Sequence, residues 1–339
     1  MLHRASTSKN STTVRSPTAL RVARAALQTA YLLSDDLGAS LAERLFTTPK
    51  HYPRPERERV VLASGRRFTV DVLLRSPRWN GARTAVSAWR WGVGPTVLLV
   101  HGWEGRGAQL GALVGPLVAA GLSVVAFDAP AHGDSPGSRL YLTDHADAII
   151  DVAAAVGPLH AIVAHSFGAA ATLLAHARGG VDAPRNVMIA PNTLIQDSVK
   201  RFARLVALDD ADRSGLEHNL AVHTGIAIDG LRIDRLIGQR DAALLVLHDR
   251  DDREVPLSHG QALAAGWPNS ALEVTEGLGH RRILRDPTVI ARAVAAVRVG
   301  VPLPPSDLVR EVDRALTGWG EVDTHTAASP GVLAQLGER

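Results

Sequence analysis

A serine at the centre of the pentapeptide A-H-S-F-G, residues 164–168, is the feature of the sequence that most directly suggests chemistry. A short apolar run precedes it, and a run rich in alanine and leucine follows it. This pattern predicts a strand, a tight turn and a helix with Ser166 at the apex, which is the context of a nucleophile elbow. Gly168 provides the small neighbour that such a turn needs, and Ala164 stands where the usual G-x-S-x-G has its first glycine. The pentapeptide alone also fits an ordinary serine in a strand-to-helix loop.

Four other short apolar runs are also followed by polar side chains that could take part in catalysis. The segments that follow them are His101 to Trp103, residues 128–135, residues 248–256 and residues 276–280. In a doubly wound parallel sheet, reactive groups gather at the carboxyl ends of the strands. In chain order, the segments after the later strands supply a serine, then an acid, then a histidine.

Short strands and helices alternate along most of the chain, which predicts an α/β fold with a mostly parallel, doubly wound sheet and helices on both faces. The expected parallel strands are residues 96–100, 123–127, 159–163, 186–190, 243–247 and 271–275, and the expected helices are 109–120, 141–156, 169–178, 257–265 and 287–299. Before them, residues 67–74 alternate apolar and polar side chains, and residues 84–91 are expected as their antiparallel partner.

Residues 192–240 interrupt this alternation with helical fragments at 197–208, 213–222 and 231–237, which predicts a small helical lid. Helices are also expected at residues 18–33, docked on the chain's own domain, and at 35–46. The predicted division is an N-terminal tail and helical extension at 1–59, a domain with the lid at 60–300, and a C-terminal tail at 301–339. Residues 1–17 are expected to be disordered, and the C-terminal tail to carry one helix at 307–316.

Taken together, residues of about 95–300 resemble the α/β-hydrolase superfamily, in which the elbow serine, an acid and a histidine follow one another in this order. The resemblance implies the α/β-hydrolase fold with a catalytic triad. Ser166 would be the nucleophile and His280 the base that accepts its proton. Asp252 would orient the histidine, because D-R-E-V-P at residues 252–256 matches the D-x-x-V-P of the family.

The resemblance also implies an oxyanion hole made by the backbone N–H groups of Trp103 and Phe167. Asp249 departs from the family pattern, because many relatives have glycine there, and Asp249 and Asp251 remain alternatives to Asp252. His101 is expected to brace its loop rather than react.

Residues 128–135 resemble the D-x-P-G-x-G-x-S turn of the family, with an expected structural role. His165 is expected to pack under the sheet edge. The other histidines of interest are expected to be surface or lid residues; they are His145, His176, His218 and His223.

The predicted function is that of a carboxylesterase-like serine hydrolase, which cleaves an ester or related acyl bond through an acyl-enzyme. The same triad also serves acyl transfer, thioester, amide and carbon–carbon bond cleavage, and a non-catalytic binding protein of the same fold is the alternative from another class. A haloalkane dehalogenase is disfavoured because its chemistry needs a carboxylate at the elbow apex. Trp103, Phe167 and the lid suggest an apolar acyl pocket. The expected partner is a small-molecule substrate, and neither a cofactor nor a metal ion is expected.

Composition narrows the class of protein further. The chain of 339 residues is 46% hydrophobic and 21% charged, as in a soluble globular protein. Thirty-seven basic against 34 acidic residues give a net charge of +3, too close to balance to indicate a nucleic-acid partner. The absence of cysteine excludes disulfides, thiolate metal sites and cysteine nucleophiles. Neither a bilayer-spanning run nor the apolar region of a secretory signal is recognisable.

No acidic residue precedes Asp35, while several arginines and many serines and threonines do. Such a segment resembles an organelle transit peptide, but the favoured interpretation is the tail of a cytoplasmic bacterial protein. Docking of this segment on a membrane or a partner is a further alternative. The oligomeric state is not predicted.

Overall fold

The structure of the protein, a computed structural model, describes residues 17–228, 232 and 241–300. The predicted disorder before residue 17, the C-terminal tail with its helix at 307–316 and, apart from Arg232, the third lid helix at 231–237 therefore lie outside the described residues. Among the described helices, none is long and apolar enough to cross a membrane.

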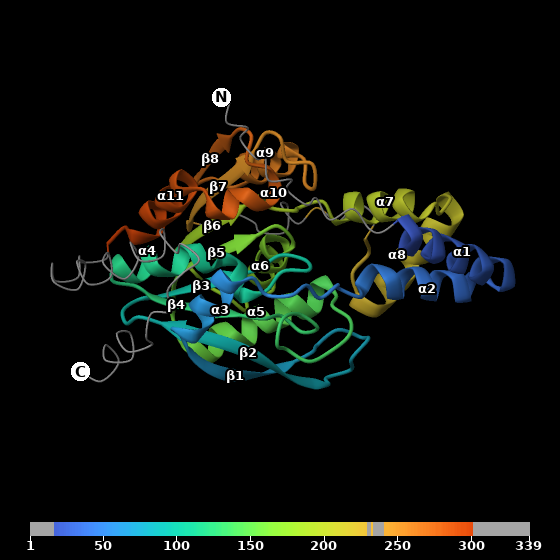
Figure 1. The fold of residues 1–339 in the computed structure, drawn as a ribbon, viewed down its shortest axis with the longest axis horizontal. Helices are drawn as coiled ribbons and strands as arrows, with labels where there is room; N and C mark the ends of the chain where they lie inside the picture. Colours follow the sequence, from blue (N-terminus) through green and yellow to red (C-terminus); the bar gives the residue numbers. More distant parts are fainter. Residues whose placement is uncertain (1–16, 229–231, 233–240, 301–339) are drawn as a thin grey trace, which may run out of the picture.

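A sheet of eight strands forms the centre of the molecule (Figure 1), in the order β1-β2-β4-β3-β5-β6-β7-β8. The strands are β1 (Arg66–Leu73), β2 (Arg83–Trp91), β3 (Thr96–Val100), β4 (Ser123–Phe127), β5 (Leu159–His165), β6 (Arg185–Ile189), β7 (Ala243–Asp249) and β8 (Ser270–Thr275). β2 runs antiparallel to both β1 and β4, and the other neighbouring pairs are parallel. Every residue of β3 and β4 is buried, as their uninterrupted apolar sequences predict.

Helices cover both faces of the sheet and bury two apolar clusters against it (Figure 1). The helices of one face are α5 (Leu142–Val156), α6 (Phe167–Ala177) and α9 (Leu257–Gly266). Those of the other face are α3 (Glu56–Ala63), α4 (Val114–Ala119) and α11 (Pro287–Arg298), together with the 3₁₀ segment Gly107–Leu113. The prediction of a doubly wound α/β sheet is therefore confirmed.

The prediction of one continuous helix at residues 109–120 was wrong in its first half. A 3₁₀ segment occupies Gly107–Leu113, and the α-helix begins only at Val114. Pro116 has no N–H, so α-helical hydrogen bonding cannot pass unbroken through this point. The short helices α3 and α10 (Gly279–Arg282) were not predicted, because neither is long enough to show a helical apolar period.

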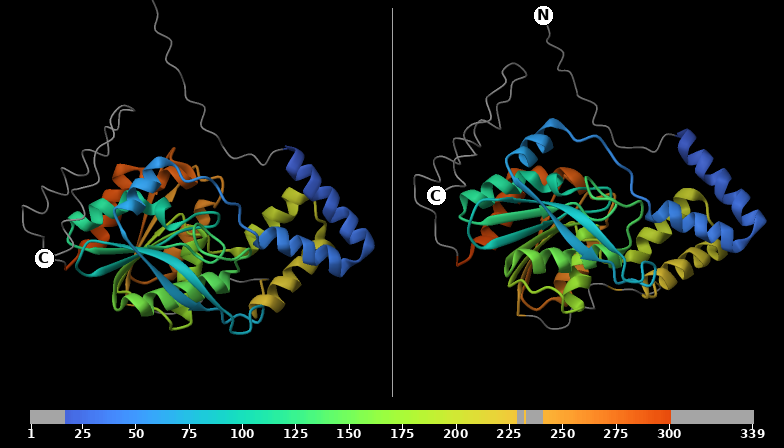
Figure 2. Two further views of the ribbon diagram at one scale, coloured as in Figure 1. Left: turned by 60° about the horizontal axis from the view of Figure 1, so that its bottom comes forward. Right: turned by 90° about the horizontal axis from the view of Figure 1, so that it is seen from below.

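Four helices lie together beyond the edge of the sheet that carries the carboxyl ends of its parallel strands (Figures 1 and 2). Two are the predicted lid helices, α7 (Ile195–Val206) and α8 (Asp210–Thr224). The other two are α1 (Pro17–Leu33) and α2 (Asp35–Thr47), which pack against them. We refer to α1, α2, α7 and α8 as the helical cap. The sequence predicted a lid from the insertion alone, whereas the cap is built from two segments far apart in the chain.

Gly168 gives a direct test of how α6 packs on the sheet. A Cβ at this position would lie 2.2 Å from the backbone oxygen of His101. We expect Gly168→Ala to lower the free energy of unfolding by about 1–3 kcal/mol through overpacking, although alanine is the better helix former by about 1 kcal/mol. Urea unfolding measures the change.

The matched control is Gly215→Ala in α8, where the added Cβ would meet only the Cβ of Ala39, at 3.2 Å. This variant is expected to be as stable as the wild type or slightly more so. A Gly168→Ala protein of unchanged or raised stability would contradict the close packing of α6 on β3.

Candidate active site

Ser166 lies at the turn between β5 and α6 with an unusual backbone conformation, φ 55° and ψ −120°. Residues other than glycine avoid positive φ, so surrounding contacts must hold it there. The Ser166 N–H donates to the oxygen of Ile189 at 3.0 Å, and its carbonyl accepts from the Asn192 N–H at 3.2 Å. The end of β6 thus fixes the turn, and the hydroxyl projects beyond the sheet edge as the elbow motif predicts.

A series of hydrogen bonds joins three of the predicted site residues. His280 Nε2 lies 2.9 Å from Ser166 Oγ, and His280 Nδ1 lies 2.7 Å from Asp252 Oδ2. The side chains of Asp252 and His280 are 0% and 7% exposed. A carboxylate can only accept, so Nδ1 carries the proton and Nε2 is free to accept from the serine hydroxyl. An imidazole in this tautomer can remove the proton of the hydroxyl as the oxygen attacks.

Asp252 stays ionised despite its burial. Its Oδ1 accepts from the backbone N–H groups of Glu254 and Val255 at 2.8 and 2.9 Å. Burial by itself raises the pKa of this carboxyl, but the neighbouring imidazoles of His248 and His280 and the hydrogen bond from Val255 outweigh it. The net result is a pKa far below the usual range, so the carboxylate is charged at any working pH.

Asp249 and Asp251, the two alternatives to Asp252, contact the backbone of the loop that carries His280, whereas Asp252 bonds the imidazole itself. Asp249 is fully buried and accepts from the N–H groups of Leu278 and Gly279 at 3.0 and 2.8 Å. It also accepts from Thr275 Oγ1 and from the N–H of Asp251. Asp251 is exposed and accepts from the Gly277 N–H at 2.9 Å. Asp249 therefore ties β7 to the His280 loop.

The two residues predicted to supply oxyanion donors lie beside the serine. Phe167 is the first residue of α6, a position whose N–H has no acceptor within the helix. The loop of Trp103 passes so close to the elbow that a Cβ on Gly102 would lie 3.0 Å from the Cβ of Ser166. The rings of Trp103 and Phe167 pack edge to face with centroids 5.7 Å apart. Both N–H groups therefore belong to segments adjoining the hydroxyl.

Two buried histidines brace the loop of Trp103, and sequence reasoning identified only His101. His101 Nε2 accepts from the Ala129 N–H at 2.9 Å, while His132 Nε2 accepts from the Glu104 N–H at 3.1 Å. The loops after β3 and β4 are thus joined in both directions. Burial lowers the pKa of His101 to about 3 and that of His132 to about 4. Both imidazoles remain neutral at working pH, as acceptors must.

Two other histidines differ from expectation, and a third makes an additional contact. His165 does lie within the elbow, but its Nε2 donates to the His280 carbonyl at 3.0 Å, a contact that the sequence does not reveal. His145 and His176 are not surface residues, since they are 0% and 1% exposed. Both lie on apolar faces of α5 and α6 that pack on the sheet. Their positions within the helical apolar period indicated burial, but histidine is a polar residue type and was therefore assigned to the surface.

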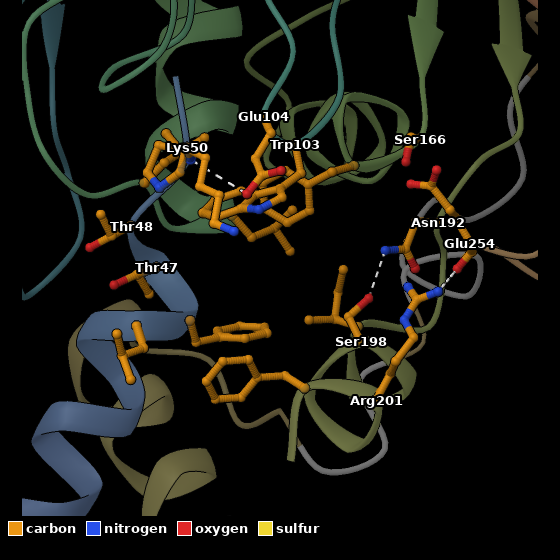
Figure 3. A pocket seen from close by; sticks show the side chains of 18 of the residues that line it. Thr47, Thr48, Lys50, Trp103, Glu104, Ser166, Asn192, Ser198, Arg201 and Glu254 are labelled. Carbon is orange, nitrogen blue, oxygen red and sulfur yellow. Dashed lines mark hydrogen bonds between the residues drawn. The ribbon is translucent and has the colours of Figure 1, made fainter. Parts of the chain in front are cut away.

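A cavity of about 550 Å³ opens onto Ser166 (Figure 3), and His280 also lines it. Its walls come from the sheet edge and from all four cap helices. The apolar lining includes Leu20, Leu45, Phe46, Ile195, Phe202, Leu220 and Ile228. Asn192 Nδ2 donates to Ser198 Oγ at 2.9 Å, and the Arg201 guanidinium contacts the Glu254 carbonyl. No cluster of three or more metal-ligating side chains occurs within the part of the chain that the structure describes.

A sequence model of the alpha/beta hydrolase family matches residues 97–293, more than half of the chain. No curated protein matches the chain. Among solved structures, an esterase of Pyrococcus furiosus is 16% identical with a TM-score of 0.55, over 74% of this chain and 97% of its own. An esterase of Rhodococcus sp. ECU1013 is 19% identical with a TM-score of 0.51, over 70% and 100%. Est1E of Butyrivibrio proteoclasticus, solved with bound ferulic acid, is 17% identical with a TM-score of 0.52, over 66% and 96%. At these identities the structures show a shared fold.

Asp249 is expected to act as a positioning residue for His280. Asp249→Ala leaves three N–H groups without their acceptor, at about 1–3 kcal/mol for each buried group. Misplacement of the imidazole should then lower kcat by about 10²-fold with little change in KM. Asp249→Asn keeps one of the two acceptor oxygens, and with it the hydrogen bonds from one pair of donors. This variant should therefore recover part of kcat.

Steady-state ester hydrolysis and urea unfolding of both variants measure these effects. Asp251→Ala, which removes one exposed contact from the same loop, is the control and should retain kcat. Wild-type kcat in Asp249→Ala would show that this carboxylate does not position the histidine.

The buried histidines predict a pH dependence of stability. In the unfolded chain they bind protons below about pH 6.5, whereas in the folded chain His132 does so only below about pH 4. Between these values the unfolded state binds more protons, so stability falls as the pH falls, by up to ~1.4 kcal/mol per pH unit for each histidine. His132→Gln should therefore show a shallower decline between pH 6.5 and 4.

Urea unfolding at a series of pH values measures this slope. The control is His218→Gln, at an exposed position of α8, which should keep the wild-type slope. Parallel profiles for wild type and His132→Gln would contradict a neutral, buried His132.

Proposed function

The chain belongs to the alpha/beta hydrolase family, and on that premise we propose that it is a serine hydrolase that cleaves an ester or related acyl bond. The observation that carries the proposal is the unbroken series Ser166 Oγ, His280, Asp252, with separations of 2.9 and 2.7 Å, at the mouth of the cavity. The esterases of similar fold support the reaction class.

In the proposed reaction, Ser166 Oγ attacks the carbonyl carbon of the substrate while His280 Nε2 accepts the hydroxyl proton. Asp252 stabilises the imidazolium that forms and holds its tautomer, without itself taking the proton. The carbonyl oxygen becomes an oxyanion, which would accept hydrogen bonds from the N–H groups of Trp103 and Phe167. Such a donor typically contributes about 3 kcal/mol to stabilisation of the transition state.

Collapse of this intermediate breaks the bond to the leaving alcohol, which takes the proton from His280. The acyl group stays on Ser166 as an ester. A water molecule then loses a proton to His280 Nε2 and attacks the acyl carbon. The second tetrahedral intermediate releases the carboxylic acid, and the proton returns to Ser166 Oγ, which restores the enzyme.

The test is turnover of p-nitrophenyl acetate, butyrate and octanoate by the wild type and variants. Ser166→Ala and His280→Ala should each lower kcat/KM by on the order of 10⁴-fold or more, because each removes a member of one catalytic unit. Ser214→Ala, at an exposed serine of the cap outside the cavity, is the matched control and should keep wild-type activity.

Far-UV circular dichroism of each variant establishes that it is folded. Comparable turnover by Ser166→Ala and wild type would contradict the proposal. A folded wild type that turns over no ester in the panel would do the same.

A further inference from the structure

Side chains from the middle and the last turn of α1 bond the N-terminal helical hairpin, α1 and α2, to the inserted helices α7 and α8. Arg24 Nε and Nη2 both donate to the Leu205 carbonyl, at 3.1 and 2.9 Å, at the last turn of α7. Tyr31 Oη donates to the Asp212 carbonyl of α8 at 3.0 Å. These contacts join residues 181 positions apart in the sequence. The hairpin is therefore held against the inserted helices α7 and α8.

A buried carboxylate fixes α2 to the body of the protein. Glu43 is 2% exposed, and its Oε1 accepts from Tyr141 Oη at 2.8 Å and contacts His223 Nδ1 of α8. Tyr141 precedes α5, so this one oxygen connects α2 to both α8 and the sheet domain. Four residues on, the Thr47 carbonyl accepts from the Leu140 N–H at 2.9 Å. A buried polar group with several partners specifies one arrangement of the elements it joins.

Between the N-terminal hairpin and the inserted helices α7 and α8, the cap interior is apolar and partly empty. Phe46 of α2 and Phe202 of α7 meet edge to face with ring centroids 5.3 Å apart. Leu20 and Ala23 of α1 line the same cavity, together with residues of the inserted helices. The cavity is continuous with Ser166, and Figure 3 shows Thr47 and Thr48 across the cavity from the serine. An apolar chamber next to a reactive group is the usual form of a small-molecule site.

We propose that this chamber binds the acyl chain of the substrate and that the N-terminal hairpin forms half of it, with Phe46 and Phe202 limiting the chain length. The inference rests on the proposed function. A volume of about 550 Å³ holds on the order of 18 groups of the size of a water molecule, at ~30 Å³ each. This suits a medium-length acyl ester, of about 8 to 12 carbons, with a small alcohol. Each buried methylene favours the longer chain by about fourfold until the phenyl pair is reached.

The chain-length profile of kcat/KM for p-nitrophenyl esters from acetate to palmitate tests the proposal. The wild type should rise steeply to octanoate or decanoate and then fall. Phe46→Ala and Phe202→Ala should each move the maximum to longer chains, by two to four carbons. Ala23→Leu fills the chamber from α1 and should move the maximum the other way, to shorter chains.

Leu37→Ala is the matched control, since Leu37 lies on α2 and is 49% exposed. It should keep the wild-type profile. Opposite shifts for the two kinds of substitution separate acyl recognition from a loss of stability, which would lower turnover of every ester alike. Thermal unfolding of each variant accompanies the kinetics.

Acetate turnover separates failure of this inference from failure of the proposed function. If the wild type turns over acetate and butyrate but Phe46→Ala, Phe202→Ala and Ala23→Leu keep its profile, the acyl-binding role of the hairpin is wrong while the hydrolase stands. A flat wild-type profile would overturn the acyl-binding role as well. If no ester is turned over by the folded wild type, the proposed function itself fails.

Discussion

The hydrogen bond between Asp252 and His280 is the interaction on which the rest of the site depends. A carboxylate at 0% exposure must be compensated for the water it loses, and the N–H groups of Glu254 and Val255 provide that compensation. Because the Asp252 carboxylate stays charged, the His280 imidazole has one tautomer and one orientation, with Nε2 directed at Ser166. The neighbouring carboxylate of Asp249 serves a separate purpose, since it holds the loop from which His280 projects.

The site contrasts two uses of histidine. His280 is placed where a proton can be taken up, next to a charged partner. Burial keeps His101 and His132 neutral, and they act as fixed acceptors for backbone N–H groups. Protonation of either would remove the acceptor that joins the loops after β3 and β4. In the proposed reaction, the same residue type therefore accepts and returns a proton in one place and supports the loops rigidly in the other.

The sequence predicted the strands, most helices and the residues around Ser166, because these depend on local patterns: apolar runs, helical periods and short motifs that follow strand ends. It could not predict that α1 and α2 complete the cap. That arrangement depends on contacts such as Arg24 with Leu205 and Glu43 with Tyr141, between segments far apart in the chain. The burial of His145 was missed for a different reason: its position on the apolar face of α5 indicated burial, but a polar residue type was taken to indicate the surface.

Covalent labelling tests the proposal that Ser166 is the nucleophile. The wild-type protein would be treated with a fluorophosphonate, which reacts with activated serines, and analysed by intact mass and peptide mapping. We expect one adduct per chain, located on Ser166, with none formed in His280→Ala. An adduct on another residue, or a folded wild type that forms none, would contradict it.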